Sequence, residues 1–162
     1  MIRTLNKSVT KYDSIEQIFK LEYKELGKQL RMVILSDYIR KGQGFEAEKD
    51  LGQLGQIGVV PIFDYLRLKV PFAQSKIGIL TGGYVVIPTY ALAQFHDIAG
   101  LMGINPADIN EQPISYDPLY VEISFKGEKK EQLVEAITRL FEAGGVYVLV
   151  GTQALLGEGW DA

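Results

Sequence analysis

The chain of 162 residues contains no cysteine and only one histidine, His96. Without cysteine there are no disulfide bonds and no thiolate zinc sites, and a single histidine cannot form a histidine-ligated metal cluster. No metal site is therefore predicted, and a reducing, cytoplasmic location is expected. His96 lies beside Phe95 in a segment with helical spacing, where partly buried packing is the simplest interpretation.

Long hydrophobic runs and a basic excess are also missing. No stretch of about 18 uncharged apolar residues occurs, and no signal-peptide pattern is seen, so neither secretion nor membrane association is expected. The chain has 17 basic and 20 acidic residues and a net charge of −3. Free-standing nucleic-acid binders usually have a clear basic excess. Any contact with nucleic acid is therefore expected to involve a few loops beside another, basic domain.

Three motifs of common enzymes are absent as well. The sequence has no G-x-x-x-x-G-K-[ST] phosphate loop, no G-x-G-x-x-G after a strand and no G-x-S-x-G elbow. We assign no catalytic residue. Asp97, Asp108 and Glu111 are interpreted as solvated surface carboxylates.

What the sequence does contain is the alternation of strands and helices typical of one α/β domain, with 47% apolar residues. Strands are predicted at 31–39 (RMVILSDYI), 76–83 (KIGILTGG, with YVVIP at 84–88 as an extension or a separate strand), 119–125 and 146–150. Helices are predicted from the capping box Ser14-Ile-Glu-Gln17 to about 30, from Pro61 onward, over 90–102, and over 129–143 before Gly144-Gly145. Residues 41–58 are predicted as a loop and 103–118 as an irregular connection.

This order predicts an open, mostly parallel sheet flanked by helices. In such sheets ligands bind outside the carboxyl ends of the strands. Three predicted strands end in polar or glycine turns, at Ser36-Asp37, Thr81-Gly82-Gly83 and Gly151-Thr152. We expect these three turns to lie on one edge of the sheet.

The segment VLVGTQALLGEGWDA (148–162) resembles motif V in the second, C-terminal RecA-like lobe of superfamily-two helicases and translocases, of the DEAD/DEAH-like, restriction- or repair-associated type. In that motif an apolar strand ends in threonine and leads through a short turn to an E-G-x-D element. RMVILSDYI is similar to the motif IV strand, and KIGILTGG to the next strand with its L-T-G turn. EQLVEAITRLFEAGGVYVLVGT (131–152) is similar to the helix and strand of motif V.

The resemblance implies that residues 1–162 form part of a RecA-like domain without its own phosphate loop, with an insertion around 83–118. It implies a motor lobe that contacts the DNA or RNA backbone and forms part of an ATP cleft. The implied contacts to the nucleic-acid backbone come from Thr81, Gly82, Gly151 and Thr152. The implied residues of the ATP cleft are Glu158, Gly159 and Asp161.

The family's first lobe and motif VI have no counterpart in the chain, which is therefore expected to be an inactive fragment of an ATP-hydrolysing protein. ATP and Mg²⁺ would be bound chiefly by the first lobe, which is also the expected partner of this chain. DNA and RNA remain alternatives. A second hypothesis is a non-motor, flavodoxin- or receiver-like module, although Asp37 stands alone after its strand and no strand ends in lysine. In the simplest alternative Thr152 only caps a turn and Asp161 is solvated.

Overall fold

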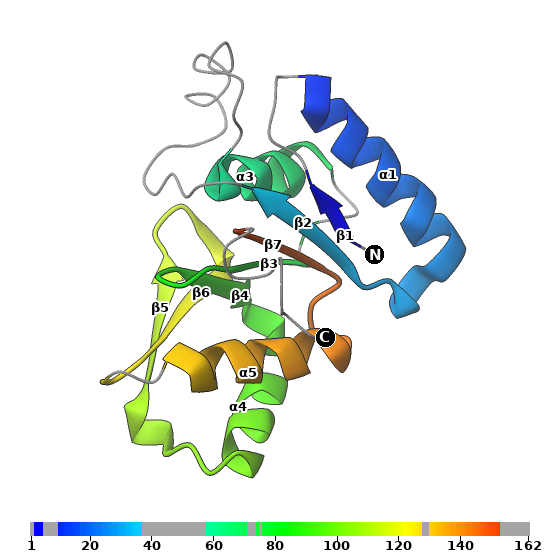
Figure 1. Cartoon of the computed structure of the whole chain (residues 1–162). Coiled ribbons are helices and arrows are strands. Elements are labelled where there is room, and N and C mark those ends of the chain that lie inside the picture. Colours follow the sequence, from blue (N-terminus) through cyan, green and yellow to red (C-terminus); the bar gives the residue numbers. More distant parts are fainter. Residues whose placement is uncertain are drawn as a thin grey trace.

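The computed structural model describes residues 2–4, 10–36, 58–70, 74, 76–127 and 130–152, with the backbone alone at 2–4, 10–11 and 130. The described strands form one sheet in the order β1-β2-β7-β3-β4-β6-β5 (Figure 1). Their bounds are β1 Ile2–Thr4, β2 Met32–Ser36, β3 Ile77–Leu80, β4 Val85–Pro88, β5 Ile109–Ile114, β6 Asp117–Phe125 and β7 Val148–Thr152. The helices are α1 Thr10–Leu26, α3 Val59–Lys69, α4 Leu92–Leu101 and α5 Lys130–Glu142, with short 3₁₀ turns at Gly27–Gln29, Thr89–Ala91 and Pro106–Asp108.

The fold is α/β, as predicted, but the sheet is mixed and the expectation of a mostly parallel sheet is wrong. β1, β2, β7 and β3 are parallel neighbours, whereas β3–β4, β4–β6 and β6–β5 pair antiparallel. The change of direction occurs at Gly82-Gly83, where the chain reverses directly from β3 into β4. A crossover helix would be needed to keep the next strand parallel, and none lies between β3 and β4.

Helices cover both faces of the sheet, with α1 and α3 on one face and α4 and α5 on the other (Figure 1). Side chains alternate between the two cores along each strand: in β7, Val148 and Val150 pack toward α1 and α3, and Leu149 packs toward α5. All three are fully buried. Burying a side chain of this size stabilises the fold by about 1.5–3 kcal/mol. Burial on both faces explains why the strands read as continuous apolar runs.

The ends of two helices were predicted correctly. Pro61 lies in the first turn of α3, where its missing N–H costs no helical hydrogen bond. After α5, Gly144 has a φ of +91°, and the Gly145 N–H donates to the carbonyl of Leu140 at 2.9 Å. This is the Schellman arrangement, in which glycine adopts the left-handed conformation without strain. The capping box was misplaced, because α1 begins at Thr10 and Ser14 lies inside it.

The prediction of an irregular connection over 103–118 is wrong. Residues 109–114 form β5, and β6 begins at Asp117. Of the residues at 84–88, Val85–Pro88 form a separate strand, β4, and do not extend β3. The region predicted as an insertion, 83–118, thus contains β4, α4 and β5, and it builds most of the antiparallel half of the sheet.

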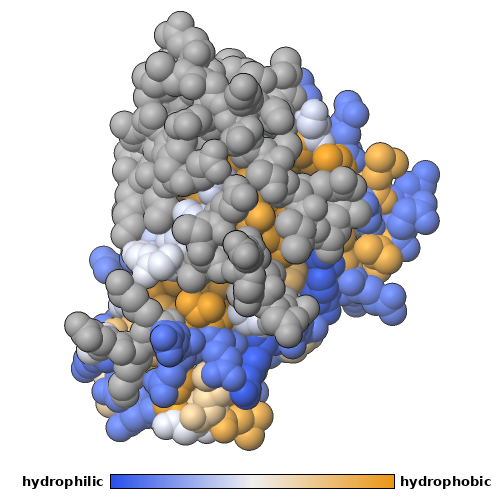
Figure 2. All heavy atoms as spheres, in the orientation of Figure 1, coloured by the Kyte–Doolittle hydropathy of each residue, from blue (hydrophilic) through white to orange (hydrophobic). Residues whose placement is uncertain are grey.

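The surface of the described residues is mixed in character. Figure 2 shows hydrophilic and hydrophobic residues interspersed over the visible side. Leu21 and Leu26 on α1 and Leu101 at the end of α4 are exposed, as scattered apolar residues on soluble domains often are. Within the described ranges, no helix combines the length and the apolar character needed to cross a bilayer.

Candidate nucleic-acid interface

The ends of three neighbouring parallel strands meet at one level of the sheet. Ser36 of β2 is paired with Thr152 of β7, and Leu80 of β3 is paired with Gly151 of β7. Thr81, the residue after Leu80, therefore lies at the level of Thr152. We call the row Ser36, Thr152, Thr81 and the adjoining Gly82 the strand-end edge. The prediction of a shared edge for these turns is confirmed, while Asp37 lies outside the described residues.

The members of the strand-end edge differ in exposure. Ser36 and Thr81 are buried, and Gly151 is buried inside the ladder between β2 and β3. Thr152 is half-buried and Gly82 is exposed. A Cβ atom added at Gly82 or Gly83 would have no heavy atom within 4 Å. Solvent therefore reaches this edge chiefly at Thr152 and along the Gly82-Gly83 turn.

The hydroxyl of Thr81 is committed to its own turn. Its Oγ1 donates to the carbonyl of Tyr84 at 2.9 Å and accepts from the Tyr84 N–H at 2.8 Å and from the Gly83 N–H at 3.3 Å. The Thr81 N–H donates to the same carbonyl at 3.0 Å. In this conformation Thr81 shapes the turn, and the group it leaves open to a ligand is the backbone of Gly82.

A hollow of about 150 Å³ lies directly beside this turn. Its walls come from the β3–β4 turn, from the second half of β6 and from the start of α5. They are formed by Gly82, Gly83, Tyr84, Val85, Glu122, Ile123, Ser124, Phe125, Gly127 and Leu133. This hollow was not predicted from the sequence. The alternation in LYVEISF places Glu122 and Ser124 on one face of a strand, but only the antiparallel pairing of β4 with β6 brings that strand to Gly82.

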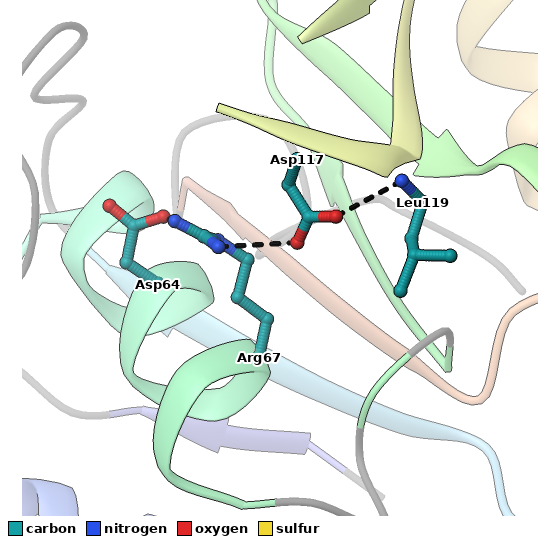
Figure 3. A network of polar contacts seen from close by, with 4 residues as sticks. All are labelled: Asp64, Arg67, Asp117 and Leu119. Atoms are coloured by element: carbon teal, nitrogen blue, oxygen red, sulfur yellow. Dashed lines mark hydrogen bonds and ion pairs between the residues drawn. The ribbon is translucent and has the colours of Figure 1, made fainter. Parts of the chain in front are cut away.

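A buried ionic cluster fixes the antiparallel half of the sheet against α3 (Figure 3). Arg67 on α3 donates from Nε to Asp64 Oδ1 at 2.9 Å and from Nη1 to Asp117 Oδ2 at 3.2 Å. The other oxygen of Asp117 accepts from the Leu119 N–H at 3.0 Å. The guanidinium carbon also lies 4.7 Å from the centroid of the Tyr116 ring. One helix is thereby held to the turn between β5 and β6.

The electrostatics of this cluster follow from its burial. Burial raises the pKa of the Asp64 carboxyl, and the attraction of Arg67 opposes this rise without cancelling it. Burial, with the nearby Asp64 charge, also raises the pKa of the Tyr116 hydroxyl, which hydrogen-bonds that of Tyr84. The pKa of Tyr84 is raised by burial and then by the charge of Glu122. Tyr84 lines the hollow, so the cluster also helps to fix one of its walls.

The single histidine, His96, pairs with one of the carboxylates that the sequence placed on the surface. The side chain of His96 on α4 is 40% exposed and contacts the carboxylate of Glu111 on β5, so Glu111 is paired and not merely solvated. Phe95 packs edge-on beside it. No group of three or more potential metal-ligating side chains is found in the part of the chain that the structure describes.

The three residues assigned to an ATP cleft, Glu158, Gly159 and Asp161, lie outside the described residues. Comparison of the chain with protein-family models, with curated proteins and with solved structures finds no match.

Proposed function

We propose that this chain is the C-terminal motor lobe of an ATP-dependent helicase or translocase and that it contacts the backbone of DNA or RNA. The observation that carries this proposal is the strand-end edge. Three parallel strands end at one level there, and two of the ends carry the T-G-G and G-T turns that resemble the family's nucleic-acid contacts. Backbone N–H groups and hydroxyls at such an edge can bind phosphates without reading bases.

The geometry narrows the roles of the four proposed contact residues. Gly82 is exposed and lets a sugar-phosphate chain approach the backbone closely. Thr152 offers a hydroxyl at the same level. Thr81 and Gly151 act indirectly, Thr81 by shaping the turn and Gly151 by packing between β2 and β3. In the proposed motor, ATP and Mg²⁺ are bound chiefly by a first RecA-like lobe, because the sequence contains no phosphate loop. ATP turnover by this chain alone is not expected.

The test is an NMR titration of the isotope-labelled chain with a single-stranded oligonucleotide at low ionic strength. We expect amide shifts to concentrate at Gly82, Gly83 and Thr152. Thr152→Val removes a neutral hydrogen bond worth about 0.5–1.5 kcal/mol and should weaken binding several-fold.

Thr89→Val is the matched control. Thr89 follows β4, which runs antiparallel to β3, so this threonine lies at the opposite edge of the sheet, and its hydroxyl donates to the carbonyl of Pro118. Equal affinities of the two variants, or shifts that avoid the strand-end edge, would argue against the proposal. Shifts at this edge with a flavin nucleotide and none with nucleic acid would favour the flavodoxin-like alternative.

A further inference from the structure

The sheet opens between β4 and β6 next to the strand-end edge. These strands pair over three residues, with Val86 opposite Glu122 as the last pair. Beyond it β4 stays paired to β3 through Val85, and β6 stays paired to β5 through Phe125. Among the described residues the β4–β6 register is not continued past Val86. The hollow beside Gly82-Gly83 occupies this opening, so it is built into the sheet and does not depend on a loop alone.

The size and lining of the hollow limit what can enter it. Sites for complete drug-sized ligands have volumes of about 300–1,000 Å³. A volume of about 150 Å³ is therefore suited to one ring system and too small for a whole nucleotide. Ile123, Phe125 and Leu133 give it an apolar floor that continues into the core. The two glycines leave the opposite wall without side chains.

The charge of the lining favours binding of a base over binding of a phosphate. Glu122 contributes a carboxylate, Ser124 a hydroxyl and Tyr84 a phenol, and the described lining contains no lysine or arginine. A phosphate inside the hollow would be repelled by Glu122. A neutral ring with an amino group would instead be accepted, because a carboxylate hydrogen-bonds the exocyclic amino group of a base such as cytosine.

The hollow is also preformed. The hydrogen bonds of Thr81 hold the glycine turn, and the hydroxyl of Tyr84 is hydrogen-bonded to that of Tyr116 beside the Arg67 cluster. Fixed walls reduce the ordering cost that a bound ring would otherwise impose.

We propose that this hollow receives one unpaired nucleobase with an exocyclic amino group, from the strand whose phosphates lie along Gly82 and Thr152. The inference rests on the proposed function and adds to it a preference for single strands and for amino-bearing bases. A base can enter only when it is unstacked and unpaired, so a duplex does not occupy the hollow.

The test compares three single strands of equal length and charge: oligodeoxycytidine, oligothymidine and an abasic strand. Binding to the complete chain is followed by fluorescence anisotropy at low ionic strength. Stacking of a base on an aromatic side chain contributes about five-fold or more in affinity, and the lining of the hollow includes Tyr84 and Phe125. We expect cytidine strands to bind best and abasic strands weakest.

Two variants examine the hollow itself. A Cβ atom at Gly83 would meet no heavy atom within 4 Å, so Gly83→Leu should add bulk to the wall of the hollow without a clash at Cβ. It should reduce the cytidine and thymidine strands to the affinity of the abasic strand. Gly100→Leu, at a similarly open glycine on α4, is the control and should leave the order unchanged. Glu122→Met should abolish the preference for cytidine over thymidine while thymidine still binds better than the abasic strand. The ratio of cytidine to thymidine affinity in Glu122→Met still tests the proposal if Gly83→Leu fails to fold.

The outcomes separate the two proposals. If the three strands bind equally while Thr152→Val weakens all of them, the hollow takes no base and the proposed function still stands. If no strand binds at all, the proposed function fails and this inference fails with it. An undiminished preference for cytidine in Glu122→Met would overturn the role given to the carboxylate.

Discussion

At the residue scale, two threonines of the strand-end edge show how similar side chains take different roles. The Thr81 hydroxyl is buried and bonds to three backbone groups of its own turn. Removing it would take away the acceptor of two backbone N–H groups and the donor to the Tyr84 carbonyl, and each such hydrogen bond is worth about 0.5–1.5 kcal/mol in stability. Thr152 is half-buried at the end of β7, so we expect its side chain to contribute less to the stability of the fold. Loss of Thr152 should therefore affect binding more than folding.

Asp64 gives the folded chain a pH dependence of definite sign. Burial raises the pKa of its carboxyl above the ordinary value of 3.8. The folded state thus holds this proton more tightly than the unfolded state. The corresponding stability is fully present below pH 3.8 and is lost as the pH rises through the raised pKa.

We therefore expect the stability of Asp64→Asn relative to the parent chain to increase as the pH rises from 3.8 through the raised pKa of Asp64. The measurement is the free energy of unfolding in urea at several pH values. The free energy of unfolding of Asp64→Asn minus that of the parent should increase above pH 3.8 and then become constant. Asp97→Asn, at an exposed position on α4, is the control for a general charge effect. A difference that is independent of pH, or that moves the other way, would contradict the assignment.

At the element scale, Arg67 joins α3 to the turn between β5 and β6, and its loss should be costly. Arg67→Leu leaves the side chains of Asp64 and Asp117 buried beside each other without a cation. Removing one partner of a buried ion pair costs about 3–5 kcal/mol. We expect a loss of stability of this size at neutral pH, measured by chemical unfolding. The loss should shrink in acid, where Asp64 is protonated.

Arg139→Leu is the matched control for this prediction. Arg139 bonds Glu135 at 2.7 Å, yet both side chains are about half exposed. Such surface pairs contribute less than about 1 kcal/mol. If the two arginine variants lose similar stability, the Arg67 cluster does not hold the antiparallel half in place.

The elements that could be predicted from the sequence are those whose signals are local. Apolar runs predicted β2, β3 and β7, and the pair Gly144-Gly145 predicted the end of α5, where Gly144 has a positive φ. β5 was missed because most of its residues are exposed and it contains Pro113, so no alternation shows. β5 is held by main-chain hydrogen bonds to β6, and such bonds depend little on which side chains are present. The one usable signal for the antiparallel half was Gly82-Gly83 between two apolar runs, a typical hairpin turn.

The candidate site also has one part that could be predicted from the sequence and one part that could not. Ser36, Thr81 and Thr152 could be placed on one edge from the sequence, because parallel strands end on the same side of a sheet. The hollow could not be predicted, because it depends on where β6 diverges from β4. That divergence is a tertiary property of two strands whose paired residues lie more than thirty positions apart in the sequence, and no local pattern encodes it.

At the scale of the whole molecule, the central position of β7 ties the proposed site to the stability of the fold. β7 is the last of the described strands in the sequence, yet it lies between β2 and β3 and contributes to both cores. The strand-end edge is therefore assembled only when this distant segment has joined the sheet. Pairings between residues so far apart in the sequence must first offset the entropy of loop closure, which makes them slow to form.

The composition of the whole chain makes a final prediction about how nucleic-acid binding depends on salt. Steep salt dependence arises when lysine or arginine side chains neutralise phosphates and release counterions. The net charge is −3, and the strand-end edge offers a backbone N–H and a hydroxyl, which are neutral. We therefore expect binding of about 10⁻⁴ M or weaker at physiological salt, with a slope of log K against log salt shallower than about −1.5. Anisotropy titrations over a salt series give both values. A slope several times steeper would mean that several basic side chains neutralise phosphates, and the principal contact would then lie away from Gly82 and Thr152.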